Sequence, residues 1–391
     1  MKLAIVSDLH GFDSGTKSEG GPSHYDVNPS RDRNQCPIEN LRSLIQKQKL
    51  SADLLLCPGD LVHQACRSSL PKVWKELNDL AILLGVSHTI ATAGNHDVDS
   101  RLQYTSYDPN EGLKTLQPGF PTNDLTLKRQ YWADHFFFFQ HDYLRLLVLN
   151  SSAYHTNKDE IEHGRISNNT LKGISNELKP STQETFNVLL CHHNPQKHSE
   201  LMLGEPDEIK GGQLLLDLLQ RPNQLGWLVI HGHKHHPKLT YAAGNSGSPI
   251  VFSAGSFAST LYPELREETG NQFYILDIDK LNLSTRGLVG TFRCWDWHKG
   301  FGWRDADSNK GLPASGGFGH REHPLVLANR IKASLHEIND KHIKGENIYT
   351  VFPELSFVSP NDLDALSVAL ESIGVACDFS EAKRITELII V

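Results

Sequence analysis

Five short segments of this 391-residue chain place aspartate, asparagine and histidine directly after apolar runs. They are Asp8–His10 (DLH), Gly59–Asp60 (GD), Gly94–Asp97 (GNHD), His192–His193 (HH) and Gly232–His235 (GHKH). Carboxylates brought together in this way would repel one another without a cation between them. A thiolate set is missing, which excludes a structural zinc finger. Mixed oxygen and imidazole donors suit Mn, Fe, Zn, Co or Ni, so the sequence predicts a metal site.

The number of donors in these segments exceeds what a single ion needs. Two aspartates, one asparagine and four histidines fit two ions that share a bridging carboxylate. Two ions can clamp both the attacking and the leaving oxygen of a phosphoryl transfer. We therefore expect two divalent cations as cofactors, with Mn favoured, and a phosphate ester as the substrate.

The polar segments follow apolar stretches of strand length. Strand-like stretches cover residues 3–10, 53–60, 88–97, 145–152, 186–194, 226–235 and 249–257. Helix-like amphipathic stretches lie between several of them, at residues 38–50, 68–85, 167–179 and 211–223. The alternation indicates βαβ units, and ligands of such sheets bind at the carboxyl ends of the strands. The sequence therefore predicts an α/β fold whose strand ends carry the site.

Two insertions and one change of composition divide the chain further. Residues 11–35 and 98–135 follow the first and third segments, and we expect them to form loops over the site. Residues 301–325 are polar and Gly-rich, which predicts a linker or mobile loop. It would separate a catalytic domain at 1–300 from a C-terminal region at 326–391. The role of that region stays open among a cap, a dimer contact, a partner-binding surface and simple stabilisation of the sheet edge.

The composition limits the classes of partner. The chain has 46 acidic and 38 basic side chains and a formal net charge of −8, which argues against broad binding to nucleic acid or membranes. A local basic groove would still admit nucleic acid. The six cysteines form no CxxC pair, and no segment approaches the roughly 18 apolar residues of a membrane span. The first residues indicate a strand rather than a signal peptide, so we expect a cytoplasmic protein; its oligomeric state stays open.

In this order, the five segments resemble the blocks D-x-H, GD, GNHD, a mid-chain histidine and GHxH of the calcineurin-like metallophosphoesterases. The resemblance covers roughly residues 1–295. It implies a four-layer α/β/β/α sandwich, in which two packed sheets are flanked by helices, here with a C-terminal extension.

The resemblance also implies a role for each metal ligand. Asp8, His10 and His235 would bind the first metal, Asp60 would bridge, and Asn95, the mid-chain histidine and His233 would bind the second. The nucleophile would be a metal-bound hydroxide, because cations depress the pKa of a bound water.

His96 and Asp97 of the GNHD block would be catalytic without binding metal. His96 would face the substrate and stabilise the transition state or protonate the leaving oxygen. Asp97 would hold the other ring nitrogen of His96 and fix its tautomer.

The mid-chain block CHHNP contains two adjacent histidines. Successive side chains of a strand point to opposite faces, so His192 and His193 are not expected to reach the same metal. Many members of the family read His-x-Pro, with the ligand two residues before the proline. That spacing favours His193 as the ligand, and His192 would then contact a ligand or a backbone carbonyl.

Substrate contacts are harder to assign. His63 lies three residues after Asp60, which would place it in the cleft. Arg165, in the segment EHGRIS, resembles a family landmark and could contact a substrate phosphate, although a surface arginine explains it as well. A structural role is the favoured interpretation of several other polar residues near the motifs: His24, Arg31, Arg33, Tyr104 and His155.

These observations predict a metal-dependent phosphoesterase, and more narrowly a phosphodiesterase. A nuclease of the same family, acting on DNA or RNA, is the alternative, since Lys17, Arg31 and Arg33 could make an insertion locally basic. A non-catalytic binding protein that retains the fold is a second alternative, which the complete set of ligands disfavours.

Overall fold

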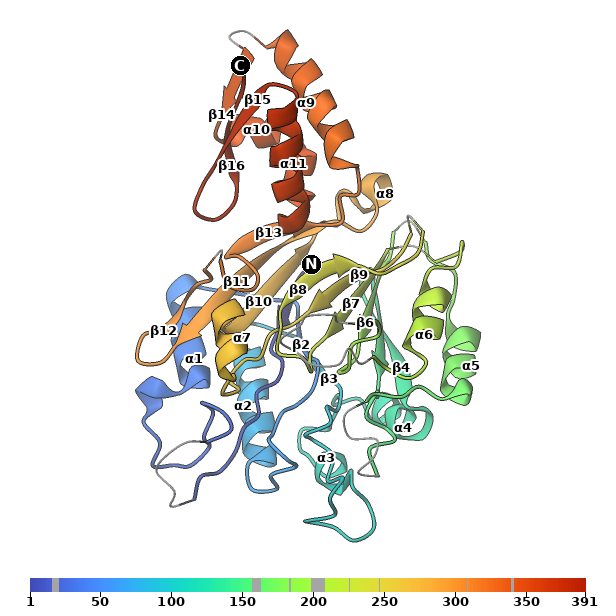
Figure 1. The fold of residues 1–391 in the computed structure, drawn as a ribbon. Helices are drawn as coiled ribbons and strands as arrows, with labels where there is room; N and C mark the ends of the chain where they lie inside the picture. Colours follow the sequence, from blue (N-terminus) through green and yellow to red (C-terminus); the bar gives the residue numbers. More distant parts are fainter. Residues whose placement is uncertain are drawn as a thin grey trace.

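The computed structural model describes residues 1–15, 21–156, 163–182, 184–197, 208–224, 226–245, 247–307, 309–338 and 341–391. Two large β-sheets form the centre of the molecule, and a smaller C-terminal unit stands at one end of them (Figure 1). The fold is α/β, as the alternation of strands and helices predicts.

The first sheet has the strand order β12-β11-β10-β1-β2-β3, and β13 also pairs with β11. Its members are β1 (Lys2–Ile5), β2 (Leu54–Cys57), β3 (His88–Ala91), β10 (Asn271–Ile278), β11 (Gly290–His298), β12 (Gly302–Asp305) and β13 (Ser315–Phe318). β1, β2 and β3 are parallel, whereas the remaining strands join antiparallel. All four residues of β2 are buried, as expected for a parallel strand covered on both faces.

The second sheet has the order β4-β5-β6-β7-β9-β8. Its members are β4 (Phe136–His141), β5 (Leu144–Leu149), β6 (Phe186–Leu190), β7 (Trp227–His231), β8 (Lys238–Tyr241) and β9 (Ile250–Ser253). β5, β6, β7 and β9 are parallel, and the edge strands β4 and β8 are antiparallel to their neighbours.

Helices cover the outer sides of the sheets. They are α1 (Pro37–Gln48), α2 (Leu70–Leu83), α5 (Asn168–Glu177) and α6 (Gly212–Leu219). Proline in the first turn starts α1 and α2, and the Ser167 hydroxyl caps α5 by accepting the Thr170 N–H. In the described part of the chain, no helix combines the length and apolar character needed to cross a membrane.

Alternating side chains of β6 show how the layers pack. Val188 and Leu190 join the core that also contains α1, α2 and the first sheet. Leu189 and the following Cys191 join a second core with α5 and α6. One face of the second sheet therefore packs on the first sheet and the other on helices, and Figure 1 shows α1 and α2 on one side of the sheets and α5 and α6 on the other.

The described residues of the two insertions lie at the lower end of the view in Figure 1, the first at the left and the second towards the centre and right. The first contains only the short 3-10 helix η1 (Arg33–Gln35) among its described residues, and the second contains α3 (Glu111–Lys114) and α4 (Leu125–Asp134). Two further short helices, α7 (Pro263–Glu268) and α8 (Leu283–Arg286), flank β10 in the chain.

The C-terminal unit has its own hydrophobic core. Its elements are α9 (Pro324–Glu337), β14 (His342–Lys344), α10 (Glu346–Val351), η5 (Pro353–Phe357), α11 (Pro360–Ser372), β15 (Val375–Phe379) and β16 (Ile385–Ile390). The strands form a small antiparallel sheet of order β14-β16-β15. Its core residues come from all three helices and from the sheet, so it is a compact unit on the larger body.

Residues 301–325 differ from the linker or mobile loop that their composition predicts. They contain β12 and β13, which both pair with β11 in the first sheet. The β13 sequence SGGF has two glycines and no apolar alternation, so its strand state comes from pairing with β11 and not from local preference.

Candidate metal centre

The five polar segments meet at the carboxyl ends of the parallel strands. The side chains lie in the turns that follow β1 (Asp8, His10), β2 (Asp60), β3 (Asn95), β6 (His192) and β7 (His233, His235). Because the two sheets pack face to face, strand ends from both sheets contribute donors to one place.

One group of donors consists of Asp8, His10, Asp60 and His235, whose potential ligand atoms all lie within 4.8 Å of one another. His10 Nε2 and His235 Nε2 are 3.0 Å apart, and His235 Nε2 is 3.4 Å from Asp8 Oδ1. Ring nitrogens that point at each other and at carboxylates form a donor set that fits a divalent cation.

A second group combines His192 and His233 with Asn95. The Asn95 Oδ1 atom lies 3.0 Å from His192 Nε2 and 3.2 Å from His233 Nδ1. One amide oxygen and two imidazole nitrogens therefore converge, again in the pattern of a metal site.

Asp60 lies between the two groups. Its Oδ2 atom is 3.5 Å from His10 Nε2 in the first group and 3.4 Å from His192 Nε2 in the second. Its side chain is 1% exposed, so this carboxylate is directed into the site and away from solvent. A single carboxylate oxygen thus faces donors from both groups.

The backbone at the site is strained. Asp8, His10, Asp60, His233 and His235 have φ values of 52°, 47°, 53°, 76° and 54°. Residues with a side chain rarely adopt this left-handed region, and such strain persists where the surrounding structure imposes it, often at functional sites. The sharp local turns bring His233 and His235, which are only two residues apart, into different groups.

Gly94 shows how closely the segments approach one another. A Cβ atom built on Gly94 would lie 2.1 Å from Asp60 Oδ1 and 2.4 Å from the Asp60 nitrogen. A side chain at this position would push β3 away from β2 at the site. The glycine before Asn95 is therefore required for the close approach.

The buried carboxylates of the site are not fully compensated by positive charge on the neighbouring histidines. Burial, together with the charges of Asp8 and Asp97, raises the pKa of Asp60 well above its usual value. Burial alone would also raise the pKa of Asp8, but the hydrogen bond and charge of His235 lower it overall. Burial lowers the pKa values of His10 and His192 well below the usual range. Two buried carboxylates among uncharged imidazoles would be stabilised by cations.

The two adjacent mid-chain histidines have different surroundings. His192 Nδ1 lies 3.0 Å from the Pro58 carbonyl oxygen, which leaves Nε2 facing Asn95 and Asp60. His193 Nδ1 lies 2.8 Å from the Ser151 hydroxyl. The structure thus favours His192 where the sequence spacing favours His193.

The faces of β6 give the reason. His192 continues the alternation of Val188 and Leu190, which face the first sheet, whereas His193 continues that of Leu189. His193 nevertheless lies close to the site. Its potential ligand atom is within 4.8 Å of those of His192 and His233, and its buried Nε2 has no hydrogen-bond partner in the described part of the chain.

His96 lies at the site, but Asp97 does not hold it as the resemblance implies. The His96 ring is 4.7 Å from the His10 ring, and its Nδ1 accepts the Gln64 backbone N–H at 3.3 Å. The Asp97 carboxylate accepts the N–H groups of Val62 at 3.1 Å and Gly94 at 2.9 Å instead. Asp97 thereby ties the loops after β2 and β3 together.

Of the two expected substrate contacts, the structure brings His63 to the site. Its ring lies 5.0 Å from that of His96 and 6.0 Å from that of His10. Arg165 forms a backbone bridge with Lys210. The neighbouring Gly164 lies against the His193 ring, so the segment supports the site from behind.

Among the residues with a favoured structural role, Arg31 is 3.2 Å from Glu76 and binds the Asp26 carbonyl, and His155 packs its ring against that of His193 at 4.9 Å. Arg31 thus ties its insertion to α2 through Glu76. Lys17, the other basic residue named with it, lies outside the described residues.

Three contributors carry no signal in the sequence. The Ser151 hydroxyl contacts His193 Nδ1, and the Gln64 backbone N–H donates to His96 Nδ1. Burial lowers the pKa of His63, and the charge of Arg101 lowers it further. All three lie far along the chain from their partners or act through the backbone, so no motif could have identified them.

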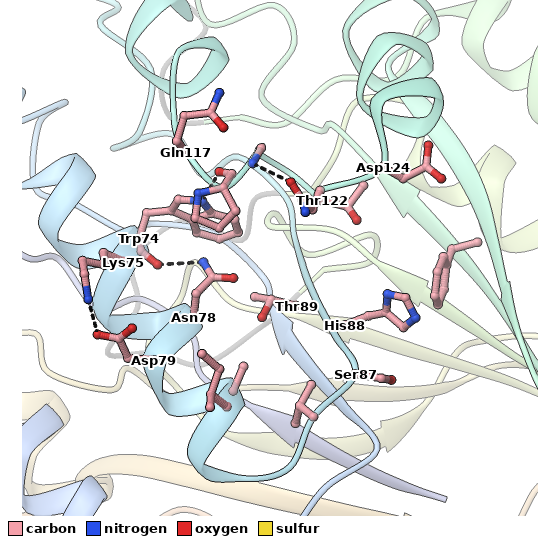
Figure 2. A pocket seen from close by; sticks show the side chains of 17 residues that line it. Trp74, Lys75, Asn78, Asp79, Ser87, His88, Thr89, Gln117, Thr122 and Asp124 are labelled. Carbon is pink, nitrogen blue, oxygen red and sulfur yellow. Dashed lines mark hydrogen bonds and ion pairs between the residues drawn. The ribbon is translucent and has the colours of Figure 1, made fainter.

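A cavity of about 870 Å³ lies elsewhere, between α2 and residues 117–124 (Figure 2). Its lining includes Trp74, Asn78 and His88 and none of the metal-centre donors. His88 is the first residue of β3, and the metal centre follows the last. This cavity is therefore remote from the chemistry.

Comparison with known proteins identifies two regions of the chain. The sequence model of the calcineurin-like phosphoesterases matches residues 1–237. A second model, described as a calcineurin-associated wHTH, a winged helix-turn-helix, matches residues 316–372. No curated protein matches the chain.

Several solved structures match parts of the chain. A purple acid phosphatase from yellow lupin (Lupinus luteus) seeds has 14% identity and a TM-score of 0.49, over 82% of this chain and 54% of that one. A putative 5′-nucleotidase from Staphylococcus aureus has 14% identity and a TM-score of 0.39, over 80% and 54%. A predicted phosphoesterase from Streptococcus pneumoniae has 10% identity and a TM-score of 0.30, over 82% and 97%. The chain spans about half the length of the first two.

The family model covers more than half of the 391 residues and includes all five segments that build the candidate metal centre. The chain belongs to the family of calcineurin-like phosphoesterases.

Proposed function

We propose that this phosphoesterase works with two metal ions and hydrolyses phosphodiesters. The position of Asp60 carries the proposal, because one of its oxygens faces His10 of one donor group and His192 of the other. A carboxylate in this position is suited to bridge two cations.

The donor groups suggest the ligands of each ion. Asp8, His10 and His235 would hold the first ion, and Asn95, His192 and His233 the second, with Asp60 shared. When bound, two divalent cations would neutralise the carboxylates and lower the pKa of an attacking water. The mixture of oxygen and nitrogen donors suits Mn, Fe, Zn, Co or Ni, with Mn favoured.

His96 would act on the substrate as a neutral hydrogen-bond donor. Burial, with the charges of neighbouring histidines, lowers its pKa to about 3, so its ring is uncharged at neutral pH. Its Nδ1 accepts the Gln64 N–H, which places the ring proton on Nε2. That N–H can donate to a phosphoryl oxygen or to the leaving oxygen as negative charge develops there.

The charges near His96 support a diester substrate. A phosphodiester carries one negative charge, whereas a monoester carries close to two at neutral pH. His63 and His96 both have lowered pKa values, and Arg101 contributes positive charge beside His63. Uncharged imidazoles with a single nearby arginine suit a singly charged ester.

The test of the proposal is the metal content and activity of matched variants. We expect about two transition ions per chain, and faster hydrolysis of bis-p-nitrophenyl phosphate than of p-nitrophenyl phosphate with Mn²⁺. His192→Ala should lose an ion and the activity, whereas His193→Ala should keep both ions. Protein that binds no metal and stays inactive when metal is added would refute the proposal. If His193→Ala lost metal and His192→Ala did not, His193 would be the ligand in place of His192.

A nuclease is the second candidate, favoured by the winged helix-turn-helix match at residues 316–372. Helix-turn-helix proteins place a recognition helix in the major groove of DNA. The charge of α11, the last helix of the unit, opposes this role, because its exposed residues include Asp364 and Glu371 and its sequence contains no lysine or arginine. Digestion of plasmid and single-stranded oligonucleotides with Mn²⁺ distinguishes the candidates.

A further inference from the structure

A crevice of about 380 Å³ lies between the first sheet and the C-terminal unit. Its floor comes from β11 and β13 and its walls from α10, η5, α11 and the turn between β15 and β16. The lining residues are Thr291, Phe292, Arg293, Ser315, Gly316, Gly317, Tyr349, Leu355, Ser356, Val358, Leu363, Lys383 and Arg384. Its volume is in the range of small-molecule sites.

Close contacts join the floor of the crevice to the C-terminal unit that forms its walls. A Cβ on Gly317 would lie 2.3 Å from the Ser356 carbonyl oxygen, so η5 rests directly on β13. The His320 N–H donates to the Phe357 carbonyl at 3.1 Å. The packing of the C-terminal unit against β13 therefore fixes the shape of the crevice.

The crevice has the opposite charge to its surroundings. Residues 324–391 contain ten acidic and six basic side chains. Arg293, Lys383 and Arg384 nevertheless line the crevice, and no aspartate or glutamate is among the described residues that do so. Three cations from two units thus gather at one cavity in a chain with a formal net charge of −8.

The existing partners of these cations are exposed or leave donors over. Arg293 donates to the exposed Gln48 Oε1 at 3.0 Å and stacks on the Trp295 ring at 4.5 Å. Lys383 is 3.2 Å from Asp364, and Arg384 is 3.5 Å from Glu346, but the two carboxylate side chains are 64% and 85% exposed. Exposed pairs of this kind contribute little stability and rearrange readily. The Arg384 guanidinium also stacks on the Tyr349 ring at 4.5 Å, which holds its position.

The other lining residues suit a ligand with phosphate groups. Thr291, Ser315 and Ser356 provide hydroxyl groups that can donate to phosphate oxygens. Arginine and lysine are the usual partners of phosphate, arginine as a two-pronged donor and lysine as a point charge.

The crevice is remote from the metal centre. Thr291 pairs with Asp277, and Asp277 pairs with Lys2 at the start of β1. The metal donors follow the other end of β1. A ligand in the crevice would therefore bind independently of the metals and would join the C-terminal unit to the catalytic sheet.

We propose that this crevice binds a small molecule with two or more phosphate groups, either a nucleotide or an inorganic polyphosphate. The number of cations favours a polyanion over a single phosphate, and the volume of about 380 Å³ favours a small molecule over a nucleic-acid duplex.

The experiment measures binding by calorimetry to the full chain after chelator treatment, so that neither probe is retained by the metal centre. The probes are methylenediphosphonate, which phosphoesterases cannot hydrolyse, and ADP. We expect saturable binding that is weakened at least about tenfold in Arg293→Gln/Lys383→Gln and unchanged in Lys341→Gln, an exposed lysine outside the crevice. Equal binding of both probes identifies the phosphates as the ligand, and tighter binding of ADP identifies a nucleotide.

Three results would overturn the proposal: no binding of either probe, equal binding by the double variant, or binding of duplex DNA that depends on these residues while both probes fail. Unfolding midpoints without probe show whether the variants remain folded. Because metal-free protein is used, a failure here is distinct from a failure of the two-metal proposal.

Discussion

Asp60 joins the two donor groups, and the residues around it divide into those that offer ligands and those that place them. Asp97 belongs to the second kind, because it accepts two backbone N–H groups from the loops that carry Asp60 and Asn95. The Gln64 backbone N–H places His96 by donating to its Nδ1. Side chains at the site thus depend on backbone contacts that residue identity alone does not reveal.

His96→Asn should separate catalysis from metal binding. A ring nitrogen of His96 lies within 4.8 Å of those of His10 and His63. His96 is not among the proposed ligands, so the variant should keep its metals. Loss of its Nε2–H should reduce kcat about 100-fold or more. Metal analysis and steady-state rates on bis-p-nitrophenyl phosphate check this. Loss of the metals together with the rate would show that His96 is a ligand.

Cys66 and Cys377 should differ in reactivity, although both are partly buried. Burial would raise the pKa of Cys66, but hydrogen bonds from Ser69 and Ser68 lower it overall. Burial and the charge of Asp378 raise the pKa of Cys377 to about 12. The thiolate is the reactive form, so at pH 8 iodoacetamide should label Cys66 first.

Peptide mass spectrometry over a series from pH 7 to pH 10 measures this difference. Labelling of Cys377 should stay slow over the whole range, because its pKa lies above it. The two cysteines should react alike in denaturant. Faster labelling of Cys377 in the folded protein would contradict the expected order.

At the scale of elements, each strand delivers its donors through a tight turn directly after its last residue. The left-handed backbone at Asp8, Asp60 and His233 reverses the chain there, and packing of the two sheets keeps it in place. The elements themselves are ordinary buried strands. The chemistry thus resides in the few residues that follow them.

Gly94→Ala should disrupt the centre through the approach of β3 to β2. The new methyl group would lie 2.1 Å from Asp60 Oδ1, which forces the carboxylate or the loop to move. We expect loss of bound metal and at least about a 100-fold loss of activity, since small displacements of catalytic groups are costly. Gly270→Ala is the control, because its Cβ would meet only ordinary contacts at 3.6 Å or more. Full metal content in Gly94→Ala would contradict this role.

At the scale of the whole molecule, the C-terminal unit has its own core yet is joined to the catalytic body by charge. The buried Glu354 of η5 pairs with Arg330 of α9 and lies 3.6 Å from Arg286 of α8. This carboxylate therefore links the unit to a helix that follows β10. The phosphate site proposed for the neighbouring crevice would add a second link.

Glu354→Gln should weaken this link without affecting the metal centre. Removing the charge leaves two partly exposed arginines facing an amide, and we expect a loss of about 1 kcal/mol in the stability of the C-terminal unit. Limited proteolysis and thermal unfolding check this, and metal content should stay unchanged. Glu346→Gln, whose side chain is 85% exposed beside Arg384, should not change either measurement. If both variants resisted proteolysis and heat equally well, the ion pairs of Glu354 would not contribute to the stability of the C-terminal unit.

The sequence by itself determined the chemistry and the class of fold. Donor residues after apolar runs predicted strand ends that meet at a metal site, because a strand and the turn after it are encoded locally. The tertiary structure decided the rest. It turned His192 and not His193 towards Asn95, because only the packing of the second sheet defines which face of β6 is inside. It placed two strands, β12 and β13, within the Gly-rich residues 301–325, because β11 supplies their hydrogen bonds. It also brought Arg293 and Lys383, which are 90 residues apart in the sequence, to the same crevice. Such pairings depend on contacts between distant segments, which no local pattern records.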